Sequence, residues 1–235
     1  MYGFYGYHLD STYILIIIGM VLSLLASARL KSTFSKYSKV RSRTGMTGAQ
    51  AAEQLLRAEG IYDVRVERIA GNLTDHYAPK EKVLRLSDSV YHQTSVAAIG
   101  VAAHECGHAM QHRDGYAPLK IRGSMVPVVN IGAQLSWPLI FIGILFSGVQ
   151  ILIQVGIILF SLTVLFQLVT LPVEFNASRR ALASLEHHGI LYSEEVPSTR
   201  KVLGAAALTY VAAAAASILQ LLRLLLLFGG RRNDD

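Results

Sequence analysis

Four long apolar stretches constrain this chain of 235 residues more than any other feature of its sequence. They cover roughly residues 12–28, 126–147, 150–171 and 205–227, and charged residues are almost absent from them. A helix needs about 20 apolar residues to cross the hydrocarbon core of a membrane. We therefore predict four membrane helices, with ends placed to within a few residues. The hydrophobic content of 52% and the charged content of 16% agree with this interpretation.

Basic residues follow the first apolar stretch and set its expected orientation. A secretory signal peptide begins with basic residues, whereas no Lys or Arg precedes this stretch. Because basic flanks are retained in the cytoplasm, we expect an uncleaved signal anchor with the N-terminus outside and residue 30 onward inside. The basic residues are Arg29, Lys31, Lys36, Lys39, Arg41 and Arg43, with no acidic residue among them.

The net charge of +6 comes largely from this basic cluster. Basic residues beside a membrane helix suit anionic lipid, so we expect the bilayer as a partner and no nucleic acid. Cys106 is the single cysteine, which excludes an internal disulfide and fits a reducing compartment. The last apolar stretch contains Arg223 and has basic residues on both sides. The sequence leaves open whether this stretch spans the membrane or lies on its surface.

The segment between the first two apolar stretches has the pattern of a small α+β unit. Thr47 and Gln50 have the spacing of a capping box, which opens a helix that Gly60 should end. Residues 62–70 and 82–87 each alternate apolar with charged or polar side chains, as half-buried strands do. We predict one short helix followed by two strands.

A longer helix should follow the second strand. Ser87 or Asp88 would be a good N-cap for it, and it should continue through His108. Together these features predict a mainly α, multi-span membrane protein that carries a small α+β unit.

This long helix contains the motif His104-Glu105-Cys106-Gly107-His108. Residues four apart lie about 6 Å from each other on one helix face, so two imidazoles can bind the same zinc ion. Glu105 is rotated by about 100° from His104 and is placed to accept the proton of a water at the metal. Apolar residues surround the motif, and ionisable groups in a buried helix need a partner. We therefore predict a zinc site.

A catalytic zinc needs a third protein ligand. His112 lies on the same helix, but three side chains on one straight helix cannot surround an ion. Glu174 follows the third apolar stretch and would lie on the same side of the membrane as the motif. From these residues alone, the assignment of Glu174 as the third zinc ligand stays open.

The segments LTDHYAPKEKVLRLSDSVYHQTSVAAIGVAAHECGHAMQH (73–112) and PVEFNASRRAL (172–182) resemble the bacterial neutral zinc metallopeptidases of the YugP type. These are multi-span proteins related in layout to the HtpX membrane proteases, and the resemblance covers nearly the whole chain. It implies a gluzincin arrangement with one zinc per chain, in which His104, His108 and Glu174 are ligands and Glu105 is the general base. It also implies a peptide or protein substrate and a bacterial plasma membrane location.

The resemblance has one departure. HtpX-like proteases carry an aspartate that orients a ligand histidine, and this chain has Ser178 at that position. We therefore expect Asn176 or Ser178 to be the hydrogen-bond partner that orients the ligand histidine.

Residues near the motif are candidate substrate contacts. Peptide substrates of zinc peptidases lie along a strand edge, so we predict substrate-binding residues in the strand before the motif helix. His76 and Tyr77 are further predicted substrate-binding residues, and the sequence offers them or Arg179 as the oxyanion donor. The predicted strand residues are Val83, Leu84, Arg85 and Leu86.

The expected function is a membrane-integrated, zinc-dependent endopeptidase with a cytoplasmic active site. An intramembrane protease is an alternative, but no Asp lies in an apolar stretch. A zinc-binding scaffold without catalysis is another, but such sites usually use cysteines. The predicted segments are 1–30 (signal anchor), 31–122 (metalloprotease unit), 123–172 (membrane hairpin), 173–202 (third-ligand helix and loop) and 203–235 (apolar helix and tail).

Overall fold

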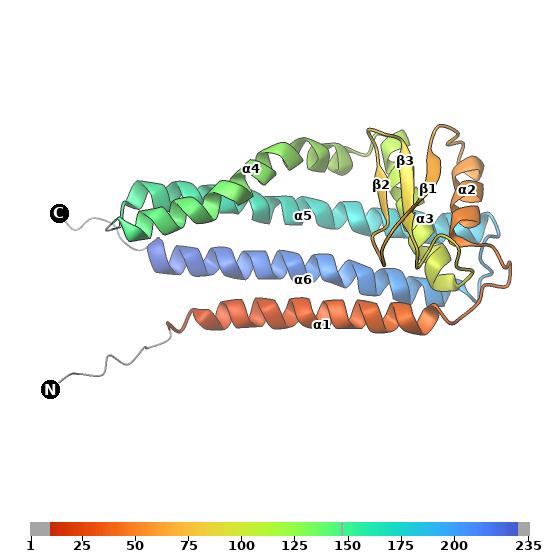
Figure 1. The fold of residues 1–235 in the computed structure, drawn as a ribbon, viewed down its shortest axis with the longest axis horizontal. Helices are drawn as coiled ribbons and strands as arrows, with labels where there is room; N and C mark the ends of the chain where they lie inside the picture. Colours follow the sequence, from red (N-terminus) through yellow and green to blue (C-terminus); the bar gives the residue numbers. More distant parts are fainter. Residues whose placement is uncertain (1–9, 147, 230–235) are drawn as a thin grey trace. The chain divides into compact units, whose positions relative to one another are not determined.

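A computed structural model describes residues 10–146 and 148–229 of the chain (Figure 1). Four of its helices (α1, α4, α5 and α6) are long and apolar enough to cross a membrane. The predicted class, a mainly α membrane protein with a small α+β unit, is confirmed. The exported N-terminal segment and the basic C-terminal tail of the prediction lie outside the described residues. The elements are α1 (Tyr13–Tyr37), α2 (Gly48–Ala58), β1 (Arg65–Ile69), β2 (His76–Ala78), β3 (Val83–Ser87), α3 (Val96–Arg113), α4 (Ala117–Leu145), α5 (Gln150–His187) and α6 (Val196–Phe228).

The chain forms two compact units, of which the first comprises residues 10–25, 125–146, 148–168 and 212–229 of the described chain. In this unit α1 and α6 run antiparallel, because Gly19 packs against Ala216 while the Tyr13 ring lies 4.4 Å from Arg223 Cζ. That cation–π contact provides a partner for the one charge inside the last apolar stretch. A buried apolar cluster joins α4, α5 and α6 and contains Ile140, Ile153, Ile157, Phe160, Val164 and Leu224.

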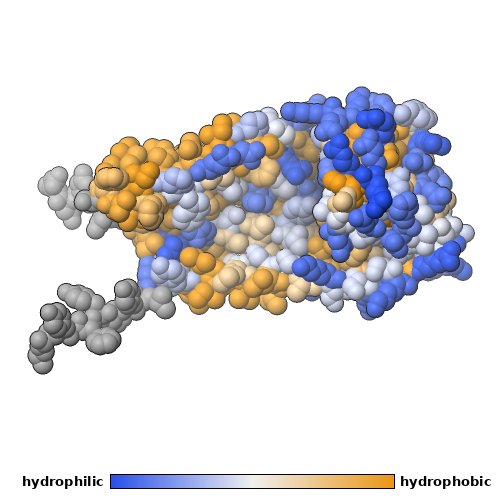
Figure 2. Space-filling model, in the orientation of Figure 1, coloured by the Kyte–Doolittle hydropathy of each residue, from blue (hydrophilic) through white to orange (hydrophobic). Residues whose placement is uncertain are grey.

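Helices of the first unit expose large apolar side chains, as lipid-facing helices do. Figure 2 shows hydrophobic residues gathered over these helices, whereas hydrophilic residues gather over the sheet and the short helices around it. The apolar surface agrees with the four candidate membrane helices.

The second unit comprises residues 26–124 and 169–211. Its three-stranded sheet has the order β1-β3-β2, in which β3 pairs in parallel with β1 and antiparallel with β2 (Figure 1). Side chains from β3 pack with α2, α3 and the last part of α5 into one core. This core holds α3, which carries the motif, in place.

The position of β3 corrects one prediction. Both of its edges are paired, so it cannot pair with a substrate strand, and the strand-edge argument that assigned Val83, Leu84, Arg85 and Leu86 to substrate contact does not hold. Val83, Leu84 and Leu86 are buried in the core, while Arg85 forms ion pairs with neighbouring glutamates. The cause is β2, whose three residues are too few to show an alternating pattern in the sequence.

The start of α3 corrects another prediction. The helix begins at Val96, after the N-cap Ser95, whose hydroxyl accepts a hydrogen bond from the backbone of Ala98. Ser87 instead ends β3 and donates its backbone N–H and its hydroxyl to Asp75. Asp88 accepts a hydrogen bond from the Gly71 backbone. These polar side chains are already committed to local bonds, so neither caps the helix.

The predicted start of α2 is confirmed. The Thr47 hydroxyl accepts from the Gln50 backbone and the Gln50 side chain accepts from the Thr47 backbone, which completes the capping box. Gly60 follows the helix with a φ of 72°, a conformation that favours glycine.

Candidate metal centre

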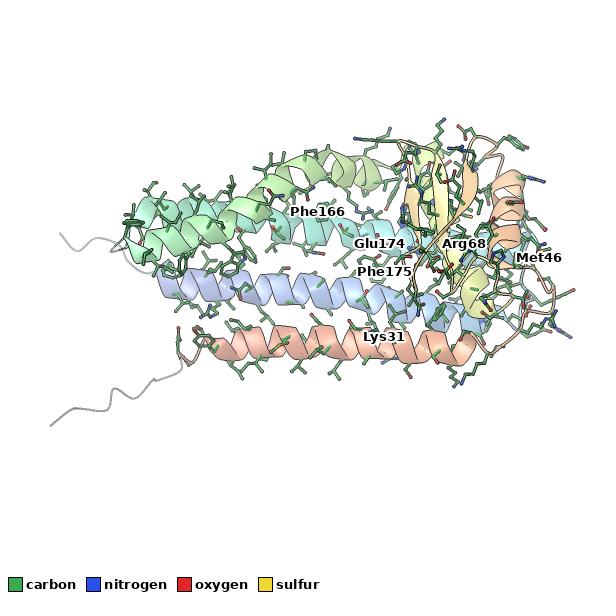
Figure 3. The ribbon with its side chains drawn as sticks, in the orientation of Figure 1. Lys31, Met46, Arg68, Phe166, Glu174 and Phe175 are labelled. Atoms are coloured by element: carbon green, nitrogen blue, oxygen red, sulfur yellow. The ribbon has the colours of Figure 1, made fainter. Side chains whose placement is uncertain are left out.

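Helices α3 and α5 come very close at the motif. Gly107 lies against the backbone of Ala177, where an added Cβ would be 2.4 Å from the carbonyl oxygen. Only a residue without a side chain permits this approach. It brings Glu174 on α5, labelled in Figure 3, next to the motif histidines on α3.

Three side chains meet here with the donor set of a zinc site. Glu174 Oε2 lies 3.2 Å from His104 Nε2 and 3.6 Å from His108 Nε2. Two ligand atoms at tetrahedral angles around zinc lie about 3.3–3.6 Å apart, given bond lengths near 2.0–2.2 Å. All three donor atoms lie within 4.8 Å of one another, and in the described part of the chain no other His, Cys, Asp or Glu joins them. The residues present therefore fit a zinc ion.

The second nitrogen of each imidazole is already bonded. His108 Nδ1 lies 3.0 Å from Gln111 Oε1, an oxygen that can only accept, so Nδ1 is the protonated nitrogen. His104 Nδ1 lies 3.0 Å from the Ser178 hydroxyl, and we assign it the same tautomer. Both Nε2 atoms are then left as acceptors that face Glu174, as metal binding requires.

Gln111 holds this arrangement in place, although no pattern in the sequence predicts its role. Its side chain is fully buried, and its amide nitrogen donates to Val173 O at 2.8 Å and to Asn176 Oδ1 at 3.0 Å. One amide thus fixes the His108 ring to the turn of α5 that carries Glu174. Ser178 resolves the question of the His104 partner, while Asn176 acts through Gln111.

Carboxylates dominate the electrostatics of the centre. Burial lowers the pKa of His108, but the closeness of the Glu174 carboxylate and the charge of Glu105 outweigh it, so the pKa lies above its ordinary value. The same carboxylates that favour a positive charge on His108 would also favour a divalent cation between the three proposed ligands.

Glu105 stands beside the cluster and does not belong to it. Its side chain is 8% exposed, and among the described residues its carboxylate accepts no side-chain hydrogen bond. Burial raises the pKa of the nearby Asp75 carboxyl, and the charge of Glu105 adds to this effect against the bonds from Ser87. The Glu105 carboxylate is thus close to the three proposed ligands without being bonded to one of them.

Its neighbour Cys106 points the other way, into the core of the unit. The thiol is completely buried and contacts Ala52 O at 3.6 Å. Burial raises the pKa of this thiol well above its ordinary value, so it stays protonated.

Two further polar groups approach Glu174 from other helices. Arg122 Nη1 on α4 lies 3.7 Å from Glu174 Oε1, the oxygen that faces away from the histidines. Tyr210 on α6 also interacts with the Glu174 carboxylate. Neither was predicted as a site residue, because no local spacing connects them to the motif.

The other predicted candidates lie outside the cluster. His112 is exposed, and its Nδ1 lies 2.8 Å from the Tyr77 hydroxyl. His76 bonds to the Thr74 carbonyl, and Arg179 is exposed on α5.

An HExxH helix whose two histidines lie within ligand distance of a glutamate from a second helix, in a chain with four candidate membrane helices, defines the class of membrane zinc metallopeptidases. Residues 12–229 match the sequence profile of the family described as "Putative neutral zinc metallopeptidase", and the chain belongs to this family. The chain is 50% identical over 198 residues to the "Putative membrane protease YugP" of Bacillus subtilis (strain 168), which covers 84% of this chain and 88% of the relative. No solved structure matches the chain. The resemblance predicted from the sequence is confirmed.

Proposed function

We propose that the chain is a membrane-integrated zinc endopeptidase that hydrolyses peptide bonds on the cytoplasmic side of the bacterial cell membrane. The convergence of His104, His108 and Glu174 carries this proposal, because their donor atoms have zinc-ligand spacing and both Nδ1 atoms are already bonded. These three residues would hold one zinc per chain.

Glu105 is the proposed general base. When bound, zinc polarises the scissile carbonyl and lowers the pKa of water at the site. Glu105 takes a proton from the attacking water and later donates it to the leaving amine, so one carboxylate serves both proton transfers.

Arg122 and Tyr210 are the proposed donors to the developing oxyanion. Both interact with the Glu174 carboxylate from helices other than α3 and α5, which puts them beside the proposed metal ligands. A guanidinium N–H and a phenol O–H in a buried site stabilise negative charge on the carbonyl oxygen. We propose them in place of His76, Tyr77 and Arg179 in this role.

The substrate is proposed to lie along β2. One edge of this strand is bonded to β3, and no strand of the described chain occupies the other. Backbone hydrogen bonds to an extended peptide suit such an edge. The strand lies beside α3, because the Tyr77 hydroxyl contacts His112. His76 and Tyr77 thus remain candidate substrate contacts, with β2 replacing β3.

The orientation is proposed from the basic residues that follow the first apolar stretch. Because α6 runs antiparallel to α1 in the first unit, we propose that it also spans the membrane, so that both chain ends lie outside.

The test compares the wild type with Glu105→Gln, both purified in detergent, for zinc content by elemental analysis and for cleavage of casein. We expect one zinc in each protein, with cleavage reduced by about 10²–10⁴-fold in the variant, since it loses the base and keeps the ligands. Undiminished cleavage by Glu105→Gln would refute the mechanism. Bound zinc without any cleavage by the wild type would favour a scaffold.

A further inference from the structure

The second unit contains a cavity of about 550 Å³ between α1 and α6. None of the proposed metal ligands lines this cavity. Three cationic side chains line it, Arg29 and Lys36 from α1 and Lys201 from α6. Two hydroxyl groups, from Ser32 and Thr33, lie between them. No carboxylate lines this basic groove.

The three cations are not neutralised by the protein. Throughout residues 10–146 and 148–229, no ion pair involves Arg29, Lys36 or Lys201. Lys36 also lies over the Tyr37 ring at 5.5 Å, a contact that brings no anionic group into the groove. Three unpaired cations that converge on one groove attract an anion, and hydroxyl donors between them suit its oxygens.

The place of the groove along the two helices indicates which anion. Arg29 is the first charged residue after the apolar stretch of α1. Lys201 is the last charged residue before residues 202–222 of α6, which carry no charge. Both helices therefore change from apolar to basic at this groove, which is the level at which membrane helices meet lipid headgroups.

Space for a ligand is also present at the α6 wall. Gly204 lines the groove, and a Cβ added there would meet nothing within 4 Å. The apolar side chain of Leu208 lies one turn further along α6, toward the apolar stretch. The groove thus presents charge at one end and apolar surface at the other, as an amphipathic ligand requires.

We propose that this groove binds the phosphate of an anionic glycerophospholipid, with Arg29, Lys36 and Lys201 around the phosphate and Leu208 against the start of an acyl chain. The proposal does not depend on peptidase activity. Each basic side chain at a membrane surface contributes about a factor of five to the affinity for anionic lipid.

The test measures retention of phosphatidylglycerol and of phosphatidylcholine by the full chain in detergent, using native mass spectrometry with a lipid titration. The double variant Arg29→Gln/Lys201→Gln should weaken phosphatidylglycerol binding by about 25-fold. The matched control, Lys31→Gln/Lys39→Gln, removes the same charge from exposed positions outside the groove (Lys31 is labelled in Figure 3) and should change binding less than twofold. Gly204→Leu fills the groove without changing the charge and should also reduce retention.

Three results would overturn the proposal. Equal losses of phosphatidylglycerol binding in the two double variants would show that the lipid is attracted to the basic surface in general and not to this groove. Phosphatidylcholine retained as tightly as phosphatidylglycerol would show that net charge is not recognised. Displacement of phosphatidylglycerol by millimolar inorganic phosphate would show a site for free phosphate.

Discussion

Replacement of Gly107 by Ala tests whether the contact between α3 and α5 sets the metal centre. The new Cβ would lie 2.4 Å from Ala177 O, 3.0 Å from its carbonyl carbon and 3.1 Å from its Cα, all of which are backbone atoms. To restore ordinary contact at about 3.4 Å, the helices must separate by about 1 Å. Overpacking of this kind costs about 1–3 kcal/mol, and the better helix propensity of Ala returns about 1 kcal/mol. Stability should therefore fall by up to about 2 kcal/mol.

The effect on zinc should be larger than the effect on stability. Metal–ligand distances in zinc sites vary by only about 0.2 Å. If Glu174 moves about 1 Å away from the histidines, the three side chains can no longer bind the same zinc ion. Loss of an outer-shell partner alone weakens metal binding about 10–100-fold. We expect Gly107→Ala to exceed that range.

The assay is a zinc titration of the purified chain in detergent, with thermal unfolding measured in parallel. Gly204→Ala is the matched control, because it has the same chemistry in a helix with nothing within 4 Å of the new Cβ. It should keep zinc affinity and raise stability by about 1 kcal/mol. Wild-type zinc affinity in Gly107→Ala would refute the argument that close helix approach assembles the centre.

The remaining predictions concern the ligands and the topology. Glu174→Ala should lose bound zinc while His112→Ala keeps it, as elemental analysis would show, and the reverse result would assign the third ligand to the motif helix. Gln111→Leu should weaken zinc binding about 10–100-fold in a chelator competition, because the His108 ring loses its partner; unchanged affinity would mean that packing alone orients the ring. A cysteine at Ser38 in a Cys106→Ala background should resist a membrane-impermeant thiol reagent in intact cells and react after permeabilisation. Labelling of intact cells would reverse the proposed orientation.

Periodic or uninterrupted patterns made much of the fold predictable. The apolar stretches are long enough to identify four candidate membrane helices, although the helices themselves extend beyond the apolar residues into the second unit. The capping box of Thr47 and Gln50 is a local device whose two hydrogen bonds depend on residues three apart. The motif histidines likewise depend only on helix geometry.

Long-range contacts were not predictable in the same way. β2 is too short to show a period, and it displaced β3 from the sheet edge. Arg122 and Tyr210 approach Glu174 from separate helices, and Gln111 crosses to α5, so no spacing in the sequence connects these groups to the motif. Glu174 itself depended on the resemblance to a family, because a carboxylate at the end of an apolar stretch has no distinguishing pattern of its own.

The buried position of Cys106 has a consequence for the redox chemistry of the chain. A thiol that lies beside the proposed base would ordinarily expose the centre to oxidants and alkylating agents. This thiol is fully buried in the core and stays protonated, so it lacks both the access and the nucleophilic form that such reagents need. We therefore expect chelators, and not thiol reagents or oxidants, to inactivate the proposed centre.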